Sequence, residues 1–195
     1  MTVLVTGAMG LLGSHVVDLL VDRGERVRAL VRSDDRLGRL SALGVEVCRG
    51  DLGDRRSLEA AVDGVESVLH CAAKTGPWGP EAEYQRANVW GLKALLDASQ
   101  AAGVRRFVHV SSITVHGNDI HGTADETAPL RIEPNPYSRT KVAGERLVAA
   151  QIREHAAAIT IVRPGWIYGP RDMASFGRFA ALIRDGKMIV IGSGA

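Results

Sequence analysis

The sequence predicts an α/β protein built on a doubly wound parallel sheet with helices on both faces. Two observations carry this prediction. Short β-branched runs alternate with segments of helical period along the chain, and a strand–helix–strand order needs crossover connections that make neighbouring strands parallel. A glycine-rich turn also joins the first strand to the first helix, as it does in many doubly wound sheets.

The first strand is the apolar run TVLVT at residues 2–6, and the first helix follows in LLGSHVVDLLVDRG. In that helix Leu12, Val16, Leu19 and Leu20 fall at helical spacing, and Gly24 gives the stop. Further strands are expected at residues 26–31, 45–48, 67–70, 107–110 and 159–162. Further helices are expected at roughly 35–43, 57–62, 83–101 and 136–154.

Composition and charge narrow the class of protein. The formal net charge is only +2 without a long Lys/Arg block, which argues against a nucleic-acid partner. The two cysteines, Cys48 and Cys71, lack the spacing of a metal site or disulfide framework. We find no signal peptide and no apolar run near the roughly 20 residues of a membrane span. We therefore expect a cytoplasmic protein with no membrane partner and no metal.

The glycine turn TGAMGLLG, residues 6–13, has the setting of a phosphate-binding loop. It follows a strand and opens a helix inside a strand–helix–strand unit. Gly7 suits the tight turn, Gly10 lets the backbone approach a pyrophosphate, and Gly13 allows close packing of helix on strand. The helix N–H groups and the helix dipole would hold the phosphates. The sequence thus predicts a Rossmann-type dinucleotide site.

The Gly-x-x-Gly-x-x-Gly spacing, with Thr6 in front, resembles the short-chain dehydrogenase/reductase superfamily. Tyr137 and Lys141 match its Tyr-x-x-x-Lys pair. The stretch VRPGWIYGPRD, residues 162–172, resembles the Arg-Pro-x-x-x-Tyr-Gly-Pro signature of the extended branch of that superfamily. The residues that carry this last match are Arg163, Pro164, Tyr168, Gly169 and Pro170.

The resemblance implies a catalytic unit of Ser112, Tyr137 and Lys141. Ser112 lies 25 positions before Tyr137, where extended members carry a Ser or Thr. A free tyrosine has a pKa near 10 and is a poor acid or base at neutral pH. We expect the Lys141 ammonium, one helical turn along, to lower that pKa. Ser112 would hydrogen-bond the substrate oxygen, and Pro136 suits the first turn of the helix that carries Tyr137.

The end of the second strand indicates which dinucleotide binds. NAD-binding members place an acidic residue there for the ribose hydroxyls, whereas this chain has Arg32 and Ser33. A guanidinium and a hydroxyl suit a 2′-phosphate, although Asp34 or Asp35 could also reach a ribose. NADP(H) is therefore favoured, and NAD(H) stays open.

The resemblance also places Asp51 and Leu52 near the adenine, and it places the strand ends and an Asn-x-x-Gly helix element around the cofactor. The full set expected to bind it is Thr6, Gly7, Met9, Gly10, Leu11, Leu12, Gly13, Arg32, Ser33, Asp51, Leu52, Cys71, Ala72, Ala73, Asn88, Ser111, Tyr137, Lys141, Pro164 and Gly165.

The substrate class is read from two stretches. Dehydratases of the extended branch need an acid–base pair after the catalytic hydroxyl, and Ile113 and Thr114 stand there instead. Residues 72–91 look like the 3β-hydroxysteroid dehydrogenase-like branch, which includes bacterial reductases of long-chain 2-alkyl-3-oxo acids. An NADP(H)-dependent oxidoreductase that interconverts a ketone and a secondary alcohol is the first expectation. A sugar-nucleotide epimerase and a non-catalytic NAD(P)-binding module or fragment are the alternatives.

We expect one NAD(P)-binding domain over residues 1–195, with an incomplete substrate-binding region beginning at about 165. Extended members usually run well beyond this length, so the chain is expected to bind cofactor but to turn over substrate weakly or not at all. By the same resemblance, the helices at about 83–101 and 136–154 should form a homodimer face. The apolar side chains expected on it are Leu92, Leu95, Leu96, Val142, Leu147 and Val148.

Overall fold

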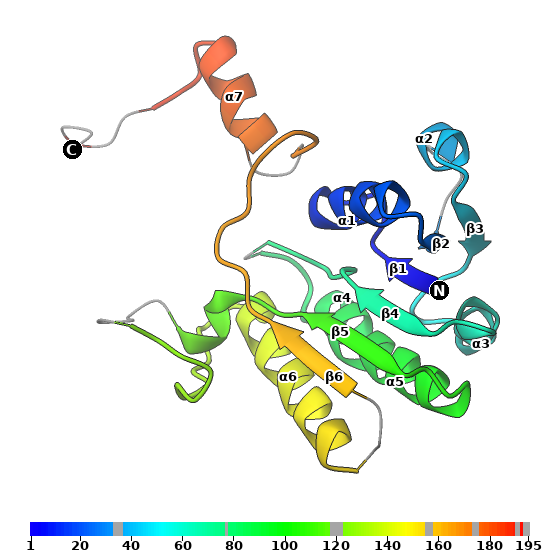
Figure 1. Ribbon diagram of the computed structural model, residues 1–195. Helices are drawn as coiled ribbons and strands as arrows, with labels where there is room; N and C mark the ends of the chain where they lie inside the picture. Colours follow the sequence, from blue (N-terminus) through cyan, green and yellow to red (C-terminus); the bar gives the residue numbers. More distant parts are fainter. Residues whose placement is uncertain are drawn as a thin grey trace.

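The computed structural model describes residues 1–32, 37–76, 78–117, 123–154, 158–172, 176–189 and 192. Six parallel strands form one sheet in the order β3-β2-β1-β4-β5-β6 (Figure 1). The strands are β1 Thr2–Thr6, β2 Arg26–Val31, β3 Glu46–Arg49, β4 Ser67–His70, β5 Arg106–Val110 and β6 Ala158–Val162. The predicted parallel sheet is confirmed, and every strand boundary lies within one residue of its predicted place.

Helices connect these strands as the crossover argument requires. They are α1 Leu11–Asp22, α2 Leu37–Ala42, α3 Arg55–Val62, α4 Glu81–Tyr84, α5 Gly91–Ala101, α6 Pro136–Glu154 and α7 Phe176–Arg184. The predicted helix at 83–101 is divided, because a π-helical turn, η1 at Gln85–Trp90, separates α4 from α5. A short 3₁₀ helix, η2 at Ile113–His116, and α7 were not expected. Residues 35 and 36 of the predicted second helix lie outside the described residues.

Helices cover both faces of the sheet, and β1 shows why. Strand side chains alternate between faces, so Leu4 points to one side and Val3 and Val5 to the other. Leu4 joins a buried cluster with side chains of α3, α5 and α6. Val3 and Val5 join a second cluster with side chains of α1 and α2. The two clusters make the sheet doubly wound, as the sequence predicts.

The strand order reverses between β1 and β4. From β1 the chain proceeds outward through β2 and β3, then returns to the other side of β1 and proceeds through β4, β5 and β6. Parallel strands all end at one edge of the sheet, so the segments that follow them gather there. Ligands of open α/β sheets bind outside the carboxyl ends at such a reversal.

The segment after β6 crosses to α1 and is held there by polar contacts. His15 Nε2 lies 3.0 Å from the carbonyl oxygen of Pro170, and Arg171 donates to His15 Nδ1 at 2.7 Å and to Asp18 at 2.8 Å. Arg171 has a positive φ of 72°. Helix α7 then stands away from the sheet (Figure 1), with no buried side chain. Among the described helices, none has the length and apolar character that a bilayer crossing requires.

Candidate active site at the carboxyl edge of the sheet

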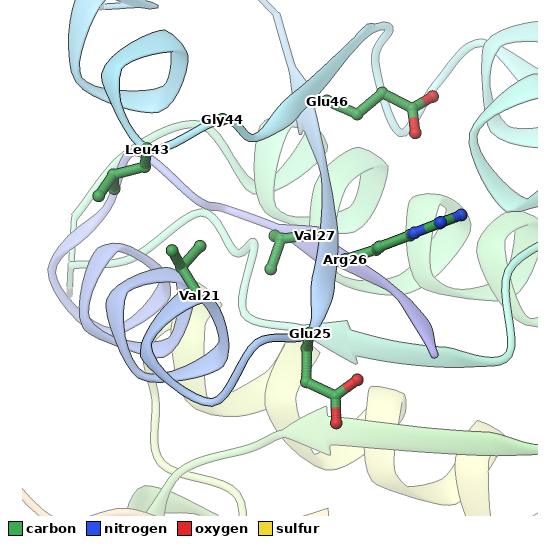
Figure 2. A pocket seen from close by; sticks show the side chains of 7 residues that line it. All are labelled: Val21, Glu25, Arg26, Val27, Leu43, Gly44 and Glu46. Atoms are coloured by element: carbon green, nitrogen blue, oxygen red, sulfur yellow. The ribbon is translucent and has the colours of Figure 1, made fainter.

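Within the described part of the chain, a cavity and the candidate catalytic side chains lie at opposite edges of the sheet. A cavity of about 360 Å³ lies where α1 and α2 end and β2 and β3 begin (Figure 2). Its two acidic side chains are already paired, Glu25 with the N-terminal ammonium and Glu46 with Arg28. The candidate catalytic residues lie after the carboxyl ends of the strands, at the opposite edge. We therefore place the candidate active site at the carboxyl edge.

The glycine loop between β1 and α1 has no room for side chains. Gly7 takes a φ of 69°, and a Cβ there would lie 2.7 Å from the backbone nitrogen of Ala72. A Cβ on Gly13 would lie 2.1 Å from the carbonyl oxygen of Gly7. Gly10 is exposed, and its N–H donates to that same carbonyl at 2.9 Å. Glycine at positions 7 and 13 thus lets the loop press against β4 and open helix α1 toward the edge.

Thr6 connects the ends of the two central strands. Its hydroxyl accepts the backbone N–H of Ala72 at 3.2 Å and forms a hydrogen bond of 2.8 Å with His70 Nδ1. His70 stacks on His109 of β5 with ring centroids 5.6 Å apart. Burial first, and then the nearby Lys141 charge, lower the pKa of His70 to about 3. Thr6 therefore holds a neutral histidine beneath the edge.

Arg32 and Asp51 meet at the ends of β2 and β3. Arg32 Nε lies 3.9 Å from Asp51 Oδ2, and both side chains are exposed, at 82% and 51%. The other carboxylate oxygen of Asp51 accepts the N–H of Gly53 at 2.8 Å. The N-cap of α3 is Asp54 rather than Asp51. Ser33, the expected partner of Arg32, lies outside the described residues.

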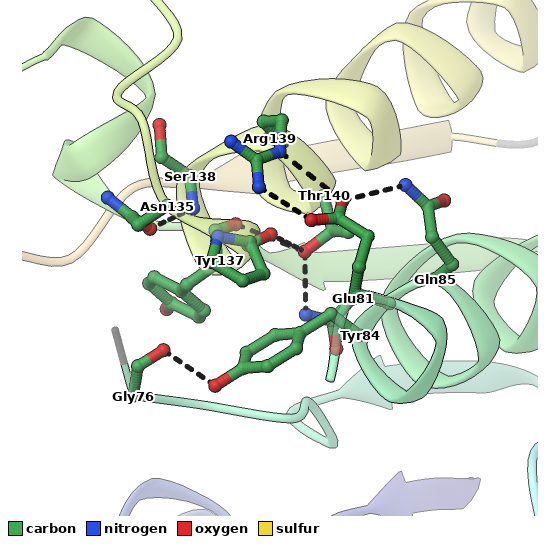
Figure 3. A network of polar contacts seen from close by, with 11 residues as sticks. Gly76, Glu81, Tyr84, Gln85, Asn135, Tyr137, Ser138, Arg139 and Thr140 are labelled. Carbon is green, nitrogen blue, oxygen red and sulfur yellow. Dashed lines mark hydrogen bonds and ion pairs between the residues drawn. The ribbon is translucent and has the colours of Figure 1, made fainter. Parts of the chain in front are cut away.

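The loop after β4 is fastened to the helices beside it (Figure 3). Asn88, in η1, accepts the N–H of Lys74 at 2.7 Å and donates to Lys74 O and to Thr140 Oγ1, both at 3.0 Å. The buried Tyr84 hydroxyl contacts backbone carbonyls of the same loop, at 2.9 Å for both Gly76 and Trp78. These contacts fix the loop in front of α6.

The start of α6 decides where Tyr137 enters the site. Helix α6 begins at Pro136 as predicted, and the Asn135 side chain before it accepts the N–H of Ser138 at 2.8 Å, as an N-cap does. The Ser138 hydroxyl accepts the N–H of Glu133 at 2.9 Å. Arg139 pairs with Glu81 of α4 at 2.6 Å (Figure 3). The first helical turn is thereby held on both sides, and Tyr137 faces the edge.

Ser112 and Tyr137 meet at the edge, but Lys141 does not act on Tyr137 as expected. Burial raises the pKa of Tyr137 above its usual value near 10, and a hydrogen-bonding interaction with Ser112 opposes that rise. The expected lowering by the Lys141 ammonium is wrong for this state of the protein. Lys141 Nζ instead donates to the carbonyl oxygen of Val110 at 2.7 Å. Its charge is directed at the end of β5 rather than at the phenol.

Lys141 is itself unusual, since its side chain is 3% exposed. Burial lowers its pKa to about 8, while electrostatic interactions with Glu145 first, and then with Cys71, oppose the shift. Cys71 is half-buried at the end of β4, and burial raises its pKa to about 11. A buried ammonium with so few charged neighbours costs free energy that the fold must supply elsewhere.

Replacing Lys141 by Met should therefore stabilise the fold. The folded pKa of about 8 lies below the unfolded value of 10.5, so the unfolded chain binds the proton more tightly. Wild-type stability should rise as the pH increases from about 8 to 10.5, and the variant should lose this slope. The shift, less the lost hydrogen bond to Val110, predicts a gain of about 2 kcal/mol at pH 7 in urea unfolding. Lys93→Met, an exposed control, should change little. A Lys141→Met chain less stable than wild type at pH 7 would contradict the argument.

The remaining expected cofactor residues line the same edge. Ser111 follows β5 and is buried, and its Oγ has no hydrogen-bond partner in the described part of the chain. Pro164 is held beside η2, because its carbonyl accepts the N–H of Ile113 at 2.9 Å. Met9, Leu11, Leu12, Leu52, Ala72 and Ala73 are half-buried, and Gly165 is exposed. The structure thus brings the described members of the set to one edge of the sheet.

Sequence reasoning did not identify several residues that build this site. Glu145 is 2% exposed and forms a bidentate ion pair with Arg163, in which Nε donates to Oε1 at 2.9 Å and Nη2 donates to Oε2 at 2.7 Å. Its position four residues after Lys141 is a usable helical-spacing signal. Thr114 contacts Ser112 two residues away, a local pattern typical of hydroxyl side chains at turns. Tyr84 gave no local signal, because its partners are loop carbonyls.

The residues fit a dinucleotide on grounds of shape and of unmet hydrogen bonding. The glycine loop would be filled by any Cβ at Gly7 or Gly13. The Ser111 hydroxyl lacks a partner within the described residues, and Arg32 presents an exposed guanidinium at the end of β2. Such a loop at a helix N-terminus suits phosphates. The fold and the site together define a dinucleotide-binding α/β protein of the Rossmann type.

The chain belongs to the NAD dependent epimerase/dehydratase family, whose profile matches residues 3–195. It is 36% identical, over all of its own length and 59% of the relative, to a 2-alkyl-3-oxoalkanoate reductase of Stenotrophomonas maltophilia. It is also 36% identical to a 3 beta-hydroxysteroid dehydrogenase/Delta 5-->4-isomerase of Mycobacterium tuberculosis, over 97% of this chain and 54% of that one. The chain therefore spans between half and three fifths of the length of these relatives. The expected family, and the branch expected within it, are confirmed.

A solved structure extends the comparison to the whole fold. A dTDP-glucose 4,6-dehydratase from Streptomyces venezuelae, with NAD bound, superposes with a TM-score of 0.89 at 28% identity. The match covers all of this chain and 66% of that one. The family and this neighbour are NAD-linked enzymes, as expected.

Proposed function

We propose that this protein interconverts a ketone and a secondary alcohol, using NADP(H), with Ser112, Tyr137 and Lys141 as its proton-transfer unit. The observation that carries the proposal is the half-buried Tyr137 beside the Ser112 hydroxyl. Burial keeps the phenol protonated at neutral pH, the state that a proton donor to a carbonyl oxygen needs. A 3-oxo acid or 3-oxosteroid is the proposed substrate class, supported by the names of the two relatives.

In this proposal each residue has one task. The glycine loop and the N-terminus of α1 hold the pyrophosphate, and Arg32 contacts the 2′-phosphate. When bound, the dinucleotide supplies the hydride. Tyr137 donates its proton to the oxygen that becomes the alcohol, and the Ser112 hydroxyl stabilises charge developing on that oxygen. Lys141, next to the same edge, is proposed to contact the nicotinamide ribose.

A sugar-nucleotide epimerase is the second candidate, supported by the family description and by the sugar-nucleotide dehydratase neighbour. A non-catalytic dinucleotide-binding module is the third. One experiment separates the three: this chain, and this chain extended with the part of the Stenotrophomonas reductase that the match leaves uncovered, are given cofactor and a panel of 3-oxo acids, 3-oxosteroids and UDP-sugars. Turnover of UDP-sugars alone would favour the epimerase. Tight cofactor binding without turnover by either protein would favour the module.

NADPH should bind more tightly than NADH because Arg32 replaces the acidic residue that holds ribose hydroxyls. A charge-assisted contact with the 2′-phosphate predicts a difference of about tenfold in dissociation constant. Titration of each reduced cofactor, followed by its fluorescence, measures it. Arg32→Asp should remove or reverse the preference. Arg55→Asp, at an arginine of similar exposure on α3, should leave it unchanged. Equal affinity for the two cofactors in the wild-type chain would refute the assignment.

We propose a homodimer on the family resemblance alone, since the side chains expected to form its face are used elsewhere. Five of the six side chains, Leu92, Leu95, Leu96, Val142 and Val148, are buried inside the chain at 0 to 3% exposure, and Leu147 is half-buried. The expectation about these residues is wrong, because both helices turn their apolar stripe to the sheet. Light scattering across a concentration series tests the oligomeric state, and a constant monomer mass would refute the dimer.

A further inference from the structure

Ser112 is surrounded by hydrogen-bond donors from a single neighbour. It follows β5 in extended conformation, with φ −161° and ψ 149°, and it caps the 3₁₀ helix η2. Its Oγ accepts the backbone N–H of Thr114 at 3.2 Å and the Thr114 hydroxyl at 3.0 Å. Ser112 is 8% exposed, so bulk water has little access to replace these contacts.

The Ser112 hydroxyl has one hydrogen-bonding group that Thr114 does not use. A serine hydroxyl has one O–H donor and two acceptor lone pairs. Thr114 occupies both lone pairs, one through its backbone and one through its side chain. The O–H is then the only unused part of Ser112, and it can only donate. Tyr137 lies beside it.

We propose that Thr114 is a positioning residue that commits Ser112 to donating, to Tyr137 in the free protein and to the carbonyl oxygen of a bound ketone. The inference rests on the proposed function and adds a residue to it. Because Ser112 has no free lone pair, the Tyr137 O–H cannot donate a hydrogen bond to Ser112. Two O–H donors are thus directed toward one substrate oxygen.

The consequence for Tyr137 has a definite sign. A Tyr137 phenolate can accept from Ser112, whereas a neutral Tyr137 finds no acceptor on Ser112 while Thr114 fills both lone pairs. Thr114→Val keeps the shape and the backbone N–H but frees one lone pair. The neutral phenol then gains a partner, so the pKa of Tyr137 should rise. One neutral hydrogen bond predicts a rise of roughly half to one pKa unit.

The test is a titration that needs neither cofactor nor substrate. The chain has three tyrosines, so ¹³C NMR of ζ-labelled tyrosine resolves each, with Tyr137→Phe assigning the signal. Thr114→Val should raise the Tyr137 pKa, and Thr114→Ser, which keeps the hydroxyl, should restore it. In a Ser112→Ala background, Thr114→Val should have no further effect. An unmoved pKa in Thr114→Val, or an equal shift in the Ser112→Ala background, overturns the proposal.

A second test measures kcat and KM for ketone reduction, in whichever protein the substrate panel shows to be active. Ketone reduction by Thr114→Val should fall about 3- to 10-fold in kcat with KM nearly unchanged, and Thr114→Ser should recover it. An unchanged kcat overturns the catalytic part of the proposal. The two failures are distinguishable: Tyr137→Phe with undiminished turnover removes the proposed function, while the NMR titration still decides whether Thr114 directs the Ser112 proton.

Discussion

Tyr137→Phe should lower the rate of ketone reduction by at least roughly 100-fold, while the dissociation constant for NADPH changes by less than about threefold. A positioned acid contributes about 100- to 10,000-fold to such a step, and phenylalanine keeps the ring that packs at the start of α6. The measurement is kcat for the best substrate of the panel, with cofactor affinity by fluorescence, in this chain and in its extended form.

The matched control is Tyr168→Phe, which makes the same change at a 70% exposed tyrosine stacked on Phe176. This variant should keep its turnover within about twofold. Undiminished turnover in Tyr137→Phe would remove the proton-donor role altogether. Equal loss of turnover and of cofactor affinity would point instead to a collapsed site.

The pH dependence follows from the same geometry. The donor must be protonated, and burial raises the Tyr137 pKa above its usual value near 10 in the free protein. Reduction should therefore persist through neutral pH and fall only when the pH rises toward that pKa. A fall that begins near pH 8 would implicate Lys141, whose pKa is lowered to about 8, rather than Tyr137.

The sheet could be predicted from sequence because each strand is a short β-branched run that ends at turn residues. In such runs the alternation of Leu4 with Val3 and Val5 already assigns both faces. The division of the helix at 83–101 could not be predicted. The π-turn there places the Asn88 amide between the Lys74 backbone and Thr140, and those partners lie 14 and 52 residues away in the chain.

The sequence predicted which residues gather at the candidate site, but it did not predict how their charges affect one another. Parallel strands end at one edge, so residues found after separate strands had to converge. The direction of the Lys141 side chain depends on the Val110 carbonyl and on the depth of burial, neither of which spacing reveals. For that reason the i, i+4 spacing predicted that Lys141 lies near Tyr137, but it led to the wrong expectation that Lys141 lowers the Tyr137 pKa.

Arg163→Met should destabilise the fold by about 3 to 5 kcal/mol. Arg163 forms the ion pair with Glu145, whose side chain is 2% exposed, and it also lies 3.3 Å from His116 Nε2. The pair thereby joins the segment after β6 to α6 and η2. Removing the guanidinium leaves a carboxylate buried without its counter-charge, which is the costly way to break such a pair. The free energy of unfolding, from urea titration, measures the effect.

Two controls separate the buried charge from the loss of one arginine. Lys93→Met breaks an exposed pair with Asp97, in which the side chains are 56% and 46% exposed, and should cost no more than about 0.5 kcal/mol. The double variant Glu145→Leu with Arg163→Met removes both charges and should recover most of the lost stability. Its cost should lie well below that of Arg163→Met alone, because no buried charge is left unpaired. If Arg163→Met costs no more than Lys93→Met, or if the double variant is as unstable as the single one, the ion pair is not what holds these three elements together.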